Sequence, residues 1–138
     1  MKRSIFWALA FTLFLFAGAI LTNDVCLAKA IKSTKNIKTL PAALKAGVPV
    51  IVKLGSDSCY PCRQMKPILK ELTIEQDGKA IFLDLDVYEN RKLASQMGVR
   101  VIPTILYYDK HGKLKNKSEG GMSKEELLSA IRELGLNK

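Results

Sequence analysis

The chain has 138 residues, of which 22 are lysine or arginine and 13 are aspartate or glutamate, so its formal net charge is +9. Many of the lysines lie in residues 32–45 and 110–117 without aromatic residues among them, which favours a solvated basic surface over a nucleic-acid site. An anionic membrane surface or an acidic partner protein is the second interpretation of this charge. The length beyond residue 30 supports one compact domain with its own hydrophobic core.

The N-terminus has the pattern of an export signal. Lys2 and Arg3 precede the uncharged stretch Ile5–Leu21, and residues 28–30 form a small-x-small cleavage site. We therefore expect a signal peptide over residues 1–30, an extracytoplasmic or periplasmic location, and a domain over residues 31–138. Because the apolar stretch is nearly long enough to span a bilayer, an uncleaved membrane anchor stays open. Cys26 lacks the small residues that precede a lipidated cysteine, so we assign it no role.

Beyond the signal, helix and strand patterns alternate. Thr39 opens a short helical pattern that ends at Gly47, and residues 48–54 form an apolar run typical of a buried strand. A second helical pattern covers residues 59–72, with apolar residues at three- and four-residue spacing that predict a face packed on a sheet. Pro67 falls inside this helix and should kink it.

The second half of the chain continues the alternation. It predicts strands over 80–87, 104–108 and 114–118 and a helix over 90–97. The turn signal at residues 109–112 predicts that the last two strands form an antiparallel hairpin. Ser123 followed by Glu126 forms a capping box that opens a final helix. The order predicts an α/β fold in which helices cover both faces of a sheet with parallel strands at its centre.

Cys59 and Cys62 stand where the first strand pattern passes into a helix. Cysteines three residues apart on a helix lie on one face, so their sulfurs can form a disulfide. Cys59, in the first turn, faces unpaired backbone N–H groups and the positive end of the helix dipole, which favour a thiolate. We therefore predict that Cys59 is the nucleophile and Cys62 the resolving thiol. Pro61 between them suits a first helical turn.

Three other uses of this cysteine pair fit the sequence less well. Attachment of a c-type haem requires histidine after the second cysteine, and Arg63 stands there. An intramolecular zinc site needs four ligands, but the chain has three cysteines and one histidine, and Cys26 lies in the predicted signal. A structural disulfide is the third alternative, but one closing so short a loop would constrain the unfolded chain little.

The residues from Val50 to Leu136 resemble thioredoxins. The resemblance is carried by the C-x-x-C corner, Pro67 in the helix that follows, the sequence Ile102-Pro103-Thr104 and Gly120 before the last helix. It implies a thioredoxin fold with Pro103 in the cis form beside the cysteines. A proline there has no N–H, which leaves the backbone of Ile102 free to pair with an extended substrate. With Tyr60 and Pro61, these residues form the substrate-binding set that the resemblance implies.

The sequence also departs from the thioredoxin pattern. Ser58 and Gly55 occupy places where thioredoxins carry tryptophan, and Tyr-Pro replaces Gly-Pro between the cysteines. Lys53 and Asp84 stand at the places where thioredoxins have a buried aspartate and a neighbouring lysine. A charge inside an apolar strand normally requires a partner, so we expect Lys53 and Asp84 to pair. Asp84 would then accept a proton near Cys62, and Lys53 would keep Asp84 ionised.

Together these features predict an exported thiol-disulfide oxidoreductase that uses no dissociable cofactor. Because Ile102 resembles the residue of reducing thioredoxins, we expect a monomeric reductase of client proteins that carry cysteines or disulfides. A reductase outside the cytoplasm must be recharged, which implies a membrane thiol-disulfide electron donor. Two alternatives stay open: a disulfide oxidase or isomerase, and a protein that handles Cu(I) without being an enzyme, since two thiolates suit that soft ion.

Overall fold

The computed structural model describes residues 33–136, and the predicted signal peptide, its cleavage site and Cys26 lie outside these residues. Within the described part, four strands form one sheet in the order β2-β1-β3-β4. The strands are β1 (Val50–Gly55), β2 (Ile81–Asp86), β3 (Thr104–Tyr108) and β4 (Leu114–Glu119). β1 pairs in parallel with β2, whereas the β1–β3 and β3–β4 pairs are antiparallel.

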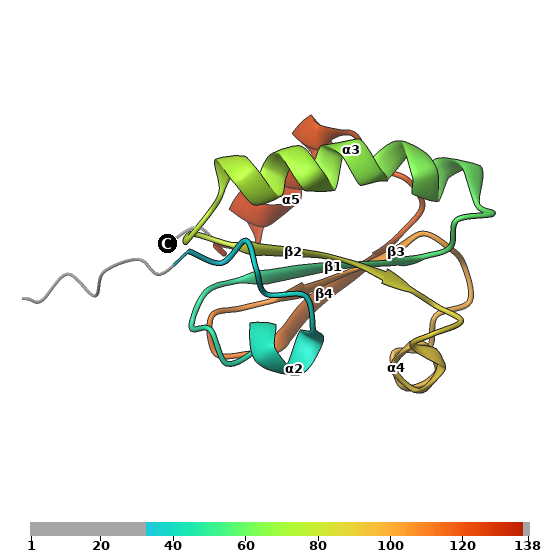
Figure 1. Ribbon diagram of the computed structural model, residues 1–138, viewed down its shortest axis with the longest axis horizontal. Coiled ribbons are helices and arrows are strands. Elements are labelled where there is room, and N and C mark those ends of the chain that lie inside the picture. The colour runs from blue at the N-terminus through green and yellow to red at the C-terminus, as the bar shows by residue number, and fades with distance from the viewer. Residues whose placement is uncertain (1–32, 137–138) are drawn as a thin grey trace, which may run out of the picture. The chain divides into compact units, whose positions relative to one another are not determined.

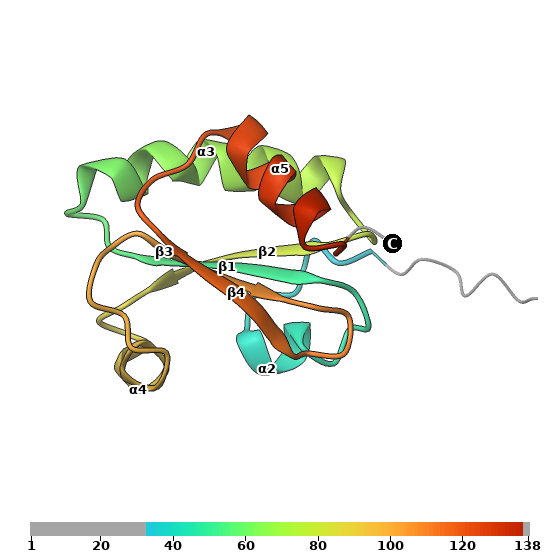
Figure 2. The same cartoon turned by 180° about the vertical axis from the view of Figure 1, so that it is seen from behind.

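Helices cover both faces of this sheet, as the sequence predicts (Figure 1 and Figure 2). One face carries α3 (Tyr60–Glu75) and α5 (Lys124–Glu133), and the opposite face carries α2 (Leu40–Ala43) and α4 (Arg91–Gln96). The chain therefore has the predicted α/β architecture. No helix within residues 33–136 combines the length and the apolar character needed to cross a membrane.

The strand directions differ from the prediction at one point. The sequence predicts parallel strands at the centre of the sheet, but the two central strands, β1 and β3, are antiparallel, and the parallel partner β2 lies at the edge. The connection from β2 to β3 contains only the six-residue helix α4. So short a helix does not carry the chain back along the length of the sheet, and β3 begins at the end where β2 stops.

The side chains of β1 alternate between two hydrophobic cores. Val50, Val52 and Leu54 pack in the core beneath α2 and α4, and Ile51 packs in the core beneath α3 and α5. Since successive side chains point to opposite faces of a sheet, Lys53 lies on the α3 side with Ile51. Strand β1 thus places the buried side chain of Lys53 on the face of the sheet that α3 covers.

Local sequence signals account for most of the helix ends. Cys59 is the N-cap of α3, and Ser123 caps α5 through the predicted capping box with Glu126. Gly98, which follows α4, has a φ of +59°, a conformation that glycine adopts at little cost. Helix α3 continues through Pro67 to Glu75. Helix α2 ends at Ala43, before the predicted end at Gly47, and the other element boundaries agree with the sequence-based ones to within about three residues.

A long-range polar clasp that the sequence did not predict holds the start of the domain. The backbone N–H of Thr34 donates a 2.7 Å hydrogen bond to Asp77 Oδ1, and the Ser33 hydroxyl donates to the same carboxylate. Lys35 Nζ lies 3.3 Å from Asp77 Oδ2, and the Gly78 N–H donates to Thr34 Oγ1. The Thr34 backbone bond is the main cause that lowers the pKa of Asp77 to about 2.

Asp77→Asn should therefore change how the stability of the fold depends on pH. The pKa of Asp77 is lowered in the folded state from an ordinary 3.8 to about 2, so its carboxylate stabilises the fold above about pH 4. This contribution disappears as the pH falls through 2. Thermal unfolding at a series of pH values should show a less stable variant at pH 7 and a smaller difference at pH 2. Glu125→Gln, which removes an exposed carboxylate, controls for net charge. A difference that does not depend on pH would contradict this account.

Candidate redox site

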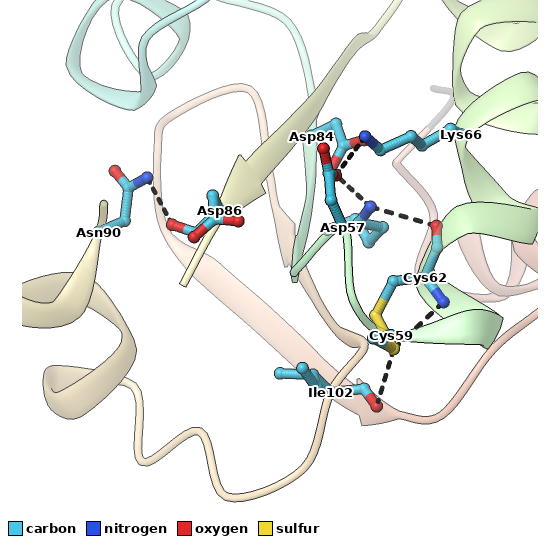
Figure 3. A network of polar contacts seen from close by, with 9 residues as sticks. Asp57, Cys59, Cys62, Lys66, Asp84, Asp86, Asn90 and Ile102 are labelled. Atoms are coloured by element: carbon cyan, nitrogen blue, oxygen red, sulfur yellow. Dashed lines mark hydrogen bonds and ion pairs between the residues drawn. A yellow bond between two sulfur atoms is a disulfide. The ribbon is translucent and has the colours of Figure 1, made fainter. Parts of the chain in front are cut away.

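Cys59 and Cys62 form a disulfide at the N-terminus of α3 (Figure 3). Cys59 has an extended backbone conformation, its Cα lies 5.3 Å from that of Cys62, and its sulfur accepts a 3.3 Å hydrogen bond from the Cys62 N–H. Pro61 stands in the first turn, where it removes no helical hydrogen bond. The strand-to-helix corner therefore brings the two sulfurs together as the spacing predicts.

The two cysteines differ in exposure. Cys59 is partly exposed, whereas Cys62 is completely buried. A protein substrate can therefore approach the sulfur of Cys59 more readily than that of Cys62. This difference supports the prediction that Cys59 is the nucleophile and Cys62 the resolving thiol.

The loop before β3 lies against the disulfide. The Ile102–Pro103 peptide bond is cis, and the Ile102 carbonyl oxygen lies 3.8 Å from Cys59 Sγ (Figure 3). Within residues 33–136, the backbone of Ile102 makes no hydrogen bond to another backbone group, so it is available to an extended peptide. Pro103 is buried, and its carbonyl accepts a 2.8 Å hydrogen bond from the Gly120 N–H.

Tyr60 stands on the solvent side of the disulfide. It is 63% exposed, the guanidinium carbon of Arg63 lies 5.6 Å from its ring centre, and its hydroxyl accepts a 2.9 Å hydrogen bond from Gln64. Pro61 is also exposed. The structure therefore brings together Tyr60, Pro61, Ile102 and Pro103 around Cys59, and their role in substrate binding stays a prediction.

Two further residues, neither of them predicted from the sequence, adjoin this surface. Val101, just before Ile102, is 48% exposed, and Gly121 lies against Pro61, where an added Cβ would contact the proline Cβ at 3.4 Å. The two consecutive glycines, Gly120 and Gly121, before the capping box were the sequence feature that could have indicated the position of Gly121. Nothing in the local pattern distinguished Val101 from a buried residue, because its exposure depends on the course of the whole loop.

Behind the disulfide, Lys53 and Asp84 form the expected ion pair. They face each other across the parallel β1–β2 ladder, and Lys53 Nζ lies 2.5 Å from Asp84 Oδ1. The Lys53 side chain is 1% exposed and that of Asp84 is 34% exposed. Lys53 Nζ also donates a 3.4 Å hydrogen bond to the Cys62 carbonyl oxygen. The pairing prediction is confirmed, and the catalytic roles assigned to the two residues stay predictions.

A polar cleft of about 280 Å³ gives this pair access to solvent. It is lined by Lys53, Gly55, Ser56, Asp57, Lys66, Asp84, Asp86 and Glu89. Lys66 and Asp57 form an ion pair there that the sequence did not predict, since the pair joins the loop after β1 to the second turn of α3. Hydrogen bonding between them lowers the pKa of Asp57 and raises that of Lys66. Within residues 33–136, no group of three or more His, Cys, Asp or Glu side chains is arranged to hold a metal ion.

Gly55 explains one departure from the thioredoxin pattern. A Cβ added at Gly55 would lie 2.8 Å from Cys62 Sγ and 3.1 Å from Lys53 Cε. Both distances are too short for the added carbon to fit without movement of its neighbours. In this chain the absent side chain at position 55 therefore leaves the space in which Cys62 and Lys53 meet.

Gly55→Ala should lower the free energy of unfolding by about 1–3 kcal/mol, the usual cost of overpacking a core. Denaturant unfolding of the oxidised protein measures this change. Gly121→Ala is the matched control, because its added Cβ would meet Pro61 at an ordinary contact distance of 3.4 Å. Equal stability losses for the two variants would show that crowding at Cys62 is not the cause.

The family comparison agrees with this geometry. The thioredoxin family model matches residues 29–133, and the chain belongs to the thioredoxin family. It carries the redox-active cysteine pair of these thiol-disulfide oxidoreductases, which act on proteins that contain cysteines.

Individual relatives show the same likeness. Thioredoxins of Rickettsia typhi and Rickettsia bellii are 38% and 33% identical over 88 residues, which cover 64% of this chain and 83% of each relative. The thioredoxin of Chlorobaculum thiosulfatiphilum is 34% identical over 99 residues, covering 72% and 89%. The solved structure of a mutant thioredoxin from Halobacterium salinarum NRC-1 has a TM-score of 0.65 at 26% identity, covering 74% of this chain and 88% of that one.

Proposed function

We propose that this thioredoxin-family protein is exported and reduces disulfides of extracytoplasmic proteins. The observation that carries the proposal is the order of the chain, in which a signal-like sequence over residues 1–30 precedes the family domain. The family match begins at residue 29, next to the predicted cleavage site after Ala30. The partly exposed Cys59 beside the free backbone of Ile102 supports a role with protein substrates.

Export determines which partners the protein needs. Outside the cytoplasm the surroundings are oxidising, so a reductase must receive electrons from elsewhere. The donor in this proposal is a membrane protein that passes reducing equivalents by thiol-disulfide exchange. The domain acts as a monomer, in which one disulfide serves one client at a time.

A disulfide oxidase or isomerase is the second candidate, and one observation favours it. Lys53 places a buried positive charge beside Cys62. A cation there stabilises a thiolate, and stabilisation of the reduced form makes a disulfide more oxidising. The two candidates therefore differ in the redox state expected in the cell, where a reductase is mainly reduced and an oxidase mainly oxidised.

Cell fractionation with acid quenching and thiol alkylation tests the location and the redox state together. We expect a soluble exported protein that begins near Ile31 by mass spectrometry, because cleavage is predicted after Ala30. Its Cys59–Cys62 pair should be mainly reduced in cells that hold the electron donor. An intact N-terminus found only in membranes would establish the anchor instead, and a fully oxidised pair would favour the second candidate.

A further inference from the structure

The side chain of Lys53 lies beside the sulfur of Cys62. A Cβ-sized atom placed on Gly55 would touch both Cys62 Sγ, at 2.8 Å, and Lys53 Cε, at 3.1 Å. The two atoms are therefore no farther apart than the sum of those distances. Lys53 Nζ also donates to the Cys62 carbonyl oxygen at 3.4 Å, so the ammonium group adjoins the resolving cysteine.

This arrangement matters because Cys62 is completely buried. Burial disfavours a thiolate, yet the resolving cysteine must become one to attack a mixed disulfide. A positive charge within about 4–6 Å favours an ionised acid, and more strongly where water is excluded. We propose that the Lys53 ammonium stabilises the Cys62 thiolate in the reduced protein and in the mixed disulfide.

The charged groups around Lys53 and Cys62 favour this stabilisation of the thiolate. Asp84 binds Lys53 from the neighbouring strand, but its side chain is 34% exposed toward the cleft, where water screens it. Asp57, Lys66, Asp86 and Glu89 line the same cleft, and Asp57 and Lys66 neutralise each other. The ladder partner of Lys53 on β3 is the apolar Ile105. Lys53 is thus the buried charge among these groups.

In the resolving step, the Cys62 thiol loses its proton, which passes into the surrounding solution. Its thiolate then attacks Cys59 Sγ, so that the bond between Cys59 and the substrate sulfur breaks and the Cys59–Cys62 bond forms. The substrate sulfur leaves with the electron pair of the broken bond and takes up a proton. Overall, the substrate disulfide gains two electrons and the cysteine pair loses two. The step rests on the exchange chemistry of the proposed function, but the ionisation of Cys62 can be measured without a substrate and whichever way the reaction runs.

The test is a pH titration of Cys62 in the full-length chain with Cys26→Ser and Cys59→Ser, which leaves Cys62 as the single cysteine. Ultraviolet absorbance of the thiolate gives the midpoint of ionisation. Adding Lys53→Met should raise the midpoint by about one to two pH units, since the nearby cation is lost and the Asp84 anion stays. Lys53→Met with Asp84→Asn removes both charges, and its midpoint should lie between the other two.

The double variant guards against misfolding of the single one, because replacing both members of a buried ion pair leaves no unpaired charge. Lys66→Met removes the same charge from an exposed site in the same cleft and should shift the midpoint by less than half as much. A double variant with the original midpoint would overturn the proposal. So would equal shifts for Lys66→Met and Lys53→Met.

Discussion

Cys59→Ser should reduce the rate of thiol-disulfide exchange by roughly a thousandfold or more, because a serine hydroxyl does not replace a thiolate as nucleophile. Cys62 cannot take over its role, since Cys62 lies in the first turn of α3 with its side chain completely buried. Reduction of a disulfide-containing protein by dithiothreitol, with and without the variant, measures the loss. Cys26→Ser should retain full activity, as we assign this cysteine no role.

Cys62→Ser should have a different effect, because Cys59 remains able to attack. The variant should accumulate mixed disulfides with client proteins, since it lacks the thiol that releases them. In the reduced wild-type protein, Cys59 should also be alkylated far faster than Cys62 at neutral pH. Clients trapped through Cys62 in the Cys59→Ser variant, or faster labelling of Cys62, would reverse the assignment.

Asp84→Asn should lower the free energy of unfolding by about 2 kcal/mol, because it leaves the buried ammonium of Lys53 without its counter-charge. This value lies below the usual cost for a buried pair, since the Asp84 side chain is 34% exposed. Lys53→Met should cost less, because methionine suits an apolar strand and the Asp84 carboxylate can turn toward water. Denaturant unfolding of each variant and of the double variant measures the coupling, which should be about 1 kcal/mol or more.

The exposed Lys66–Asp57 pair is the control for this comparison of single and double variants. It lies in the same cleft, and we expect no measurable coupling between its members, because exposed pairs are screened by water. In the Lys53→Met and Asp84→Asn variants, the rate at which the mixed disulfide releases the client protein should change more than the rate at which the mixed disulfide forms. Additive effects of Lys53→Met and Asp84→Asn on both stability and turnover would show that the two residues are not coupled.

Local patterns predicted the parts of the fold that depend on local physics. The Ser123–Glu126 capping box gave the start of α5, and the spacing of Cys59 and Cys62 gave the corner of the site. The Lys53–Asp84 contact was also predictable, because a buried lysine needs a partner and the family resemblance aligned the two strands.

The features that the sequence did not reveal depend on long-range geometry. Strand β3 runs antiparallel to β1 because the short helix α4 does not carry the chain back along the sheet. The pattern of residues within β3 does not indicate this direction. The Thr34–Asp77 clasp joins residues 43 positions apart, and each looks like an ordinary polar surface residue by itself. The position of Lys53 between Cys62 and Asp84 likewise required the packing of α3 on the sheet.

The reduction potential of the Cys59–Cys62 couple tests the proposed direction of the reaction most directly. It can be measured by equilibrating the purified protein with glutathione or dithiothreitol buffers and separating the two forms after alkylation. Disulfide proteins of this kind span about −270 mV for reducing thioredoxin to about −120 mV for a strong oxidase. The account predicts a potential in the reducing half of that range, but above that of thioredoxin itself, because Lys53 stabilises the reduced form. A potential near about −120 mV would contradict the reductase and support the oxidase.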